Sequence, residues 1–124
     1  TLSSRHYLKV ANTKAQNMLE NRMEPIYSML GLNGIDEYSV DHLDYFWKSL
    51  LKNHPHDSIC GCSRDEVHKH MEDNYERLDE ACSMYLNKGL EITAYHSAAC
   101  DHGNSDYTLA LVNTTEREEN ERTC

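Results

Sequence analysis

VDHLDYFWKSLL, residues 40–51, is the most apolar of the three long stretches that have helical spacing. Its apolar side chains recur three and four residues apart, which places them on one face of an α-helix. Ser39 can cap the start, and the helix must end near Pro55, because proline lacks an N–H donor and pushes the preceding residue out of the α region. We therefore predict a central helix whose buried face is Val40, Leu43, Phe46, Trp47, Leu50 and Leu51.

A second amphipathic pattern precedes this stretch and predicts a helix over roughly residues 3–30. Pro25 lies inside the pattern, so we expect it to kink or divide the helix. Gly31 and Gly34 supply the stop and the turn. The apolar positions of this predicted helix are Leu8, Ala11, Ala15, Met18, Leu19, Met23, Ile26 and Leu30.

A third helix is predicted after residue 62. Ser63 and Glu66 have the spacing of a capping box, in which each side chain bonds the backbone amide of the other residue. The helix ends near Gly89 or continues to about Ser97. Its apolar positions keep helical spacing and are Val67, Met71, Tyr75, Leu78, Cys82, Tyr85 and Leu86.

Three amphipathic helices joined by short links predict an all-α domain, an antiparallel three-helix bundle, over residues 1–98. Residues 99–124 have linker composition followed by one apparent strand at 107–113, a C-terminal stub of a β-strand. An isolated strand is unstable in water, so we expect a β domain to follow it. The missing initiator methionine at Thr1 likewise suggests that the chain begins inside a longer protein.

The charge balance narrows the range of partners. Twelve Lys and Arg against 21 Asp and Glu give a net charge of −9, which argues against nucleic acid and anionic membrane, since both require a basic surface. No apolar run suits a membrane span or a signal peptide. The five cysteines form no regular disulfide framework, so we interpret them as reduced thiols of a cytoplasmic protein.

Potential ligands are densest between the second and third predicted helices, in residues 53–63. One interpretation is structural: the histidines end a helix, Asp57 caps a turn, and the cysteines are small core residues. The other is a self-contained zinc site made by His54, His56, Cys60 and Cys62, with His68 or His70 as a further candidate ligand. The single residue between the cysteines is a tighter spacing than structural zinc sites use.

The remaining histidines are weaker candidates. His68 and His70 lie two apart on a helix and point about 200° from each other, so they cannot bind one ion together. We interpret both as surface residues or residues of a helix seam. Asp101 and His102 fall in the predicted linker and are expected to be solvated.

The sequence Asn-His-Pro-His-Asp-Ser-Ile-Cys-Gly-Cys-Ser at residues 53–63, followed by residues 65–68, Asp-Glu-Val-His, resembles the bacterial branch of glycoside hydrolase family 38, the α-mannosidases. Residues 2–5 are similar to the family's exit from its catalytic α/β domain, and residues 109–114 to the opening strand of its C-terminal β domain. The resemblance implies a helical middle domain between those two domains.

The resemblance also implies roles for two residues. His56 would be a ligand of the active-site divalent metal, usually zinc, and Asp57 would hydrogen-bond hydroxyls of the mannose being cleaved. Animal relatives have His-His-Asp where this chain has Pro55-His56-Asp57, which leaves the implied ligand in place. His54 inherits no role. The two catalytic carboxylates of the retaining mechanism would belong to the α/β domain, so no catalytic residue is expected in this segment.

We therefore expect the middle domain of a metal-dependent retaining α-mannosidase, resembling mannosylglycerate hydrolase. Its partners would be an α-mannoside and the enzyme's own α/β and β domains. The chain alone should be inactive and should bind no stable metal, because one imidazole cannot hold zinc. The alternatives are a free-standing acidic helical module that binds a protein, or a small His/Cys zinc module.

Overall fold

The computed structural model describes residues 4–35 and 40–100, with the side chains of Val40 and residues 98–100 left undescribed. The helices in chain order are α1 (His6–Met18), the π-helical turn η1 (Leu19–Met23), α2 (Glu24–Leu32), α3 (Val40–Leu51), α4 (His56–Ile59) and α5 (Asp65–Cys100). The predicted all-α class is confirmed for these residues. The strand predicted at residues 107–113 lies outside them.

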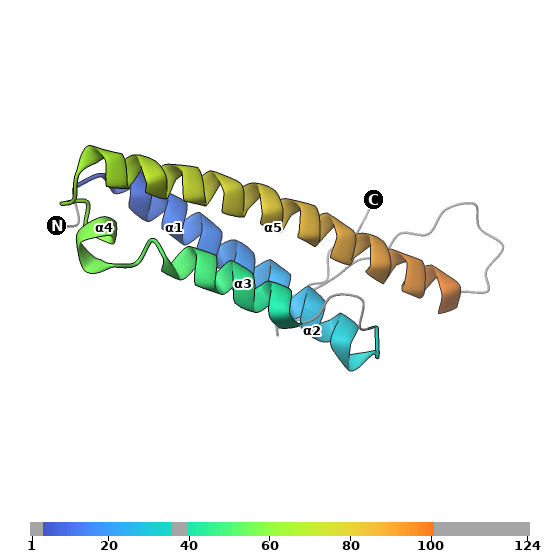
Figure 1. Cartoon of the computed structure of the whole chain (residues 1–124). Coiled ribbons are helices and arrows are strands. Elements are labelled where there is room, and N and C mark those ends of the chain that lie inside the picture. Colours follow the sequence, from blue (N-terminus) through green and yellow to red (C-terminus); the bar gives the residue numbers. More distant parts are fainter. Residues whose placement is uncertain (1–3, 36–39, 101–124) are drawn as a thin grey trace.

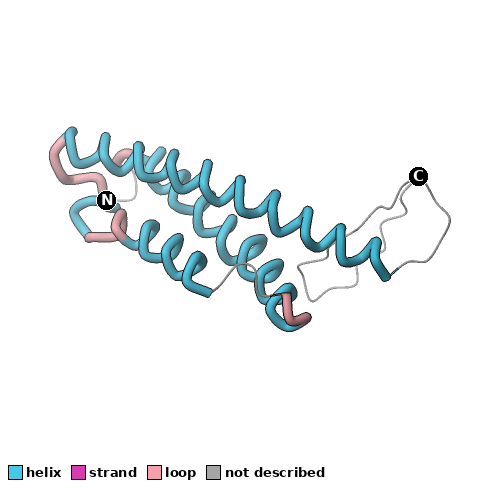
Figure 2. The backbone as a smooth tube through the Cα atoms, turned by 45° about the vertical axis from the view of Figure 1, so that its right-hand side comes forward, coloured by secondary structure: helices cyan, strands magenta, loops and turns pink. Residues whose placement is uncertain are grey.

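The helices form three rods that lie along one another (Figure 1). α1, η1 and α2 are continuous and make the first rod, α3 runs back beside it, and α5 runs the full length of both (Figure 2). α5 contacts α1, α2 and α3, while α3 also contacts α1 and η1. The core at their meeting is made by Leu8, Ala15, Leu19, Met23, Ile26, Tyr27, Leu30, Phe46, Leu50, Met71, Tyr75, Leu78, Cys82 and Ile92.

The π-helical turn η1 lies just before Pro25, the residue that was expected to kink or divide the first helix. Ala15, Leu19 and Met23 are buried at intervals of four, a spacing that drifts around an α-helix of 3.6 residues per turn. The wider turn of η1 cancels this drift, and Glu24 N–H donates back to the Leu19 carbonyl. Pro25 then lies in the first turn of α2, where a missing N–H is tolerated.

The third predicted helix differs from expectation at both ends. α5 begins at Asp65, and the Arg64 carbonyl accepts from the amides of Val67 and His68 at 3.1 and 3.2 Å. Within residues 40–100 no hydrogen bond joins the Ser63 hydroxyl to this first turn, so the capping-box prediction is wrong. The Ser63 carbonyl instead accepts from the His68 ring at 3.1 Å. The helix continues to Cys100, beyond both predicted ends, near Gly89 and at about Ser97.

Polar contacts fix how the rods are aligned. Trp47 Nε1 donates to Glu24 Oε1 at 2.7 Å and joins α3 to α2. The Tyr27 hydroxyl donates to the Tyr85 carbonyl at 2.7 Å and joins α2 to α5. Among the described helices, none is long and apolar enough to cross a bilayer.

Candidate functional site

The connection between α3 and α5 carries the residues singled out by the sequence. Asn53 is buried and donates through Nδ2 to the Met71 carbonyl at 3.4 Å. The His54 ring donates to Asn12 Oδ1 on α1 at 2.7 Å. Pro55 is extended (φ −48°, ψ 136°) and starts α4, so part of the predicted loop is a one-turn helix. The chain thus leaves the core at Asn53 and turns outward at Pro55.

His56 and Asp57 occupy the first turn of α4 and point into solvent. The His56 side chain is 91% exposed and the Asp57 side chain 65% exposed. His56 Nε2 lies 3.2 Å from Asp57 Oδ1. An exposed pair of this kind is held weakly, since water competes for both partners. Both groups are therefore accessible to a ligand that approaches this end of the molecule.

Cys62 closes the turn onto Asp57. Its backbone N–H donates to the Asp57 carbonyl at 3.2 Å, and its thiol lies 3.6 Å from both Asp57 Oδ1 and the Asp57 carbonyl oxygen. Cys62 is exposed and Cys60 is half-buried, and both are free thiols. The interpretation of the pair as core residues is therefore wrong for Cys62, which contacts the site instead.

The far side of the turn rests on the segment that enters α1. The Ser4 hydroxyl donates to the Gly61 carbonyl at 3.1 Å, and Lys9 Nζ donates to the Cys60 carbonyl at 3.1 Å and also to the Ser4 carbonyl. Gly61 has φ +81°, and a Cβ there would lie 3.1 Å from the Ser4 carbonyl oxygen. Glycine suits this position because the positive φ strains any other residue, and a Cβ would also force Ser4 to shift slightly.

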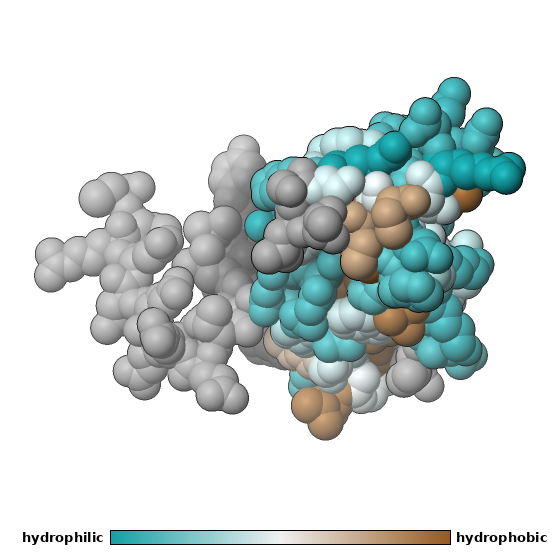
Figure 3. All heavy atoms as spheres, turned by 90° about the vertical axis from the view of Figure 1, so that its left-hand side faces the viewer, coloured by the Kyte–Doolittle hydropathy of each residue, from teal (hydrophilic) through white to brown (hydrophobic). Residues whose placement is uncertain are grey.

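The entering residues, α4 and the start of α5 thus meet at one end of the molecule (Figure 1). Arg5 joins this end through an ion pair with Asp65 on α5 at 2.7 Å. Seen end on, the described surface is mostly hydrophilic, with a few hydrophobic side chains among the polar ones (Figure 3). His56 and Asp57 share this end with the residues from which the chain enters α1.

The candidate metal ligands are not gathered into one site. Among residues 4–35 and 40–100, no group of three His, Cys, Asp or Glu side chains is placed to hold an ion. His54 is engaged with Asn12, and His68 is buried within the seam of the helices, while His70 is exposed. The self-contained zinc site is thus not formed in the described part of the chain. Asp101 and His102 lie outside it.

Residues that support the loop were missed by reasoning from sequence. Ser4, Lys9 and Asn12 contact residues 42 to 57 positions further along the chain. Local periodicity carries no information at such separations, and Lys9 and Asn12 suit ordinary exposed helix positions. Only the antiparallel packing of the predicted helices, which places α1 beside the loop, could have suggested these contacts.

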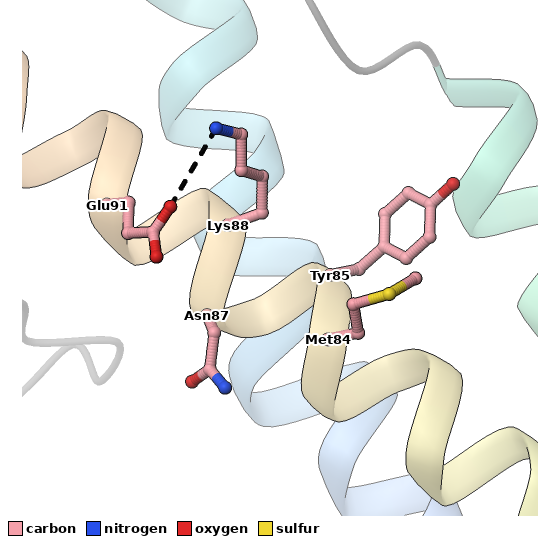
Figure 4. Close-up of a pocket in the computed structure, with 5 residues that line it drawn as sticks. All are labelled: Met84, Tyr85, Asn87, Lys88 and Glu91. Atoms are coloured by element: carbon pink, nitrogen blue, oxygen red, sulfur yellow. Dashed lines mark ion pairs between the residues drawn. The ribbon is translucent and has the colours of Figure 1, made fainter.

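A shallow hollow of about 420 Å³ lies elsewhere, along α5, and is lined by Met84, Tyr85, Asn87, Lys88 and Glu91. Figure 4 shows Lys88 paired with Glu91 on α5, and Tyr85 pointing toward α3. Lys88 Nζ lies 3.8 Å from Glu91 Oε2, and both side chains are exposed. The hollow offers no nucleophile or cluster of ligands, so the α4 turn remains the candidate site.

Comparison with known proteins identifies the family to which this helical chain belongs. The family model described as the α-mannosidase middle domain matches residues 1–92. The chain therefore belongs to the α-mannosidase middle-domain family, the helical middle domain of glycoside hydrolase family 38.

Individual relatives agree with this assignment. A protein of Halalkalibacterium halodurans described as "Putative mannosylglycerate hydrolase" is 40% identical over 113 residues, which is 90% of this chain and 12% of that protein. A family 38 protein from Enterococcus faecalis is 45% identical, with a TM-score of 0.67 over 74% of this chain and 11% of its own. An α-mannosidase from the same organism is 46% identical, with a TM-score of 0.65 over 72% and 10%. This chain thus spans about an eighth or less of each relative's length.

Proposed function

We propose that this chain acts within a metal-dependent retaining α-mannosidase. In that enzyme His56 binds a divalent metal, which we expect to be zinc, and Asp57 binds the sugar. The family supports hydrolysis of α-mannosides. The 40% identity to a protein described as a mannosylglycerate hydrolase favours the branch that cleaves mannosylglycerate.

One observation carries the proposal: His56 and Asp57 are both exposed and adjacent, at the end of the molecule where the chain enters α1. A histidine ring buried among the helices would have been out of reach of an ion shared with another domain. The contact of His56 with the Asp57 carboxylate does not oppose metal binding, because an exposed pair is readily exchanged for a stronger partner.

The residues present fit one part of a metal site. His56 can supply one neutral imidazole, whereas a catalytic zinc site needs about three protein ligands. The remaining ligands would come from the α/β domain. When bound, the metal would engage vicinal mannose hydroxyls and favour distortion of the ring. Asp57, an acceptor when ionised, would take hydrogen bonds from the sugar hydroxyls.

The domain plan follows from the same proposal. Residues 1–98 would form the antiparallel three-helix bundle, and residues 99–124 a linker with the first strand of a β domain. The two catalytic carboxylates would lie in the α/β domain, so this chain alone would be inactive. Free thiols at Cys60, Cys62 and Cys82 are compatible with a cytoplasmic, bacterial enzyme.

Replacement of His56 in the intact glycosidase tests the metal role. The His56→Ala variant should lose metal-dependent hydrolysis of an α-mannoside by at least about a hundredfold and should bind less metal, because a ligand is removed. His70→Ala is the matched control, since His70 is also exposed but lies on α5. It should keep activity within about twofold. Full activity and metal content in His56→Ala would refute the assigned role.

Zinc titration of the 124-residue chain, followed by calorimetry, tests whether the site is shared between domains. We expect only weak binding, because the described residues bring no three ligands together. Tight binding at one equivalent, lost together in Cys60→Ala and His54→Ala variants, would instead favour a small His/Cys zinc module.

A further inference from the structure

The α4 turn is held from both sides by a single helix, α1. Before the turn, His54 donates to Asn12 at 2.7 Å. After it, Lys9 donates to the Cys60 carbonyl at 3.1 Å, and Ser4, just before α1, donates to the Gly61 carbonyl at 3.1 Å. His56 and Asp57 lie between these two attachments. The direction in which they point is therefore set by α1 and by the turn that precedes it.

We propose that Lys9 is a positioning residue for the His56–Asp57 pair, an inference that rests on the function proposed above. Its ammonium group bridges two backbone carbonyls, that of Ser4 in the entering segment and that of Cys60 at the end of α4. Carbonyls at the end of a helical turn lack partners within the helix. A lysine ammonium has three donors, so it can satisfy both carbonyls at once.

Backbone hydrogen bonds connect the carbonyl that Lys9 holds to the residues of the site. Cys60 N–H donates to the His56 carbonyl at 3.0 Å, and Cys62 N–H donates to the Asp57 carbonyl at 3.2 Å. A displacement of Cys60 therefore moves α4 with it. On the other side, the Gly61 carbonyl accepts from the Ser4 hydroxyl at 3.1 Å, which fixes the end of the turn. Lys9 is half-buried, so water competes for its hydrogen bonds less than it would on an open surface.

Hydrogen exchange in the 124-residue chain tests the proposal without reference to catalysis. The Lys9→Met variant keeps the aliphatic stem and removes the charged donor. We expect the amides of Cys60, Gly61 and Cys62 to exchange at least about tenfold faster, because the turn loses its attachment. Lys14→Met is the matched control on the same helix, since Lys14 pairs with Asp79 at an exposed site. Equal exchange at these amides in the two variants would overturn the proposal.

Kinetics of the intact glycosidase give the second measurement. Lys9→Met should lower kcat/KM by about tenfold or more, since small displacements of positioned groups are costly, while Lys14→Met stays within about twofold. If Lys9→Met fails to fold, Ser4→Ala removes one hydrogen bond to Gly61 and should show the same faster exchange to a smaller degree. Unchanged exchange and unchanged kcat/KM in Ser4→Ala would then overturn the proposal.

The two proposals fail in different ways. Loss of activity in His56→Ala with no effect of Lys9→Met on either measurement would reject the role of Lys9 alone. Full activity in His56→Ala with faster exchange in Lys9→Met would reject the metal role and keep the attachment of the turn.

Discussion

At the scale of single residues, the surroundings of each thiol set its chemistry. Cys82 is buried in the core between the helices, and burial, reinforced by the nearby Asp79 carboxylate, raises the pKa of its thiol to about 11. Cys62 is exposed at the α4 turn beside Asp57. The reactive species is the thiolate, which a raised pKa makes scarce at neutral pH.

We predict that iodoacetamide at pH 8 alkylates Cys82 at least about a hundredfold more slowly than Cys62, because Cys82 is both shielded and protonated. Peptide mass spectrometry of timed samples measures the two rates. In denaturant the rates should converge, which serves as the control. The raised pKa favours the folded state below about pH 9, and this contribution is lost as the pH rises toward 11. Equal rates in the native chain would contradict the burial of Cys82.

At the scale of elements, glycine decides how closely α2 and α5 approach. A Cβ at Gly89 would lie 2.9 Å from Ile26 Cγ2 and 3.4 Å from the Tyr27 ring. Ile26 is buried and branched at Cβ, so it cannot easily move aside. Gly31 in α2 has nothing within 4 Å of its Cβ position. A side chain is therefore excluded by close packing at Gly89, whereas Gly31 has room for one.

Gly89→Ala should lower the free energy of unfolding by about 1–3 kcal/mol, because the added methyl group overpacks the α2–α5 contact. Gly31→Ala should raise it by up to about 1 kcal/mol, because alanine loses less conformational entropy in a helix. Urea unfolding followed by circular dichroism gives both values. A stabilised Gly89→Ala variant would show that the helices can separate without loss.

The π-helical turn and Pro25 lie inside the first rod, where α1 passes into α2. Proline normally costs about 3 kcal/mol inside a helix, yet Pro25 follows the π-helical turn and falls in the first turn of α2. The apolar spacing of four across Ala15, Leu19 and Met23 requires the wider turn in any case. Apolar packing and Pro25 thus both favour a π-helical turn at this point. The backbone hydrogen bonds change from the α to the π pattern there, while the rod stays continuous.

At the scale of the whole molecule, one hydrophobic core joins all three rods. Two neighbouring residues on α3 differ sharply in how far that core buries them. Leu50 is fully buried, whereas Leu51 is 53% exposed, so the predicted burial of Leu51 is wrong. Leu50→Ala should lower the free energy of unfolding by about 2–5 kcal/mol through lost burial and a cavity. Leu51→Ala should change it by less than about 0.5 kcal/mol. Chemical denaturation of the pair measures the difference, and similar losses in both would show that Leu51 is covered.

The helices were predictable because their information is local. The three-and-four spacing of apolar residues located α3 at Val40–Leu51 and the first rod at nearly its full length, since burial of one helical face imposes that period on the sequence. The π-helical turn was not foreseen, although the run of fours from Ala15 to Met23 was visible. The capping box at Ser63 was mispredicted: the observed contact of Ser63 is made by its carbonyl, which accepts from the His68 ring.

The sequence by itself determined the helical class, the family and the residues that the family resemblance marks, His56 and Asp57, because a motif and a period are properties of neighbouring residues. Only the tertiary structure decided that these side chains face solvent, that Cys62 contacts Asp57, and that Lys9 and Ser4 hold the turn. Those contacts join residues as far as 57 positions apart. Packing of the rods creates them, and no local pattern encodes which polar groups meet when helices pack.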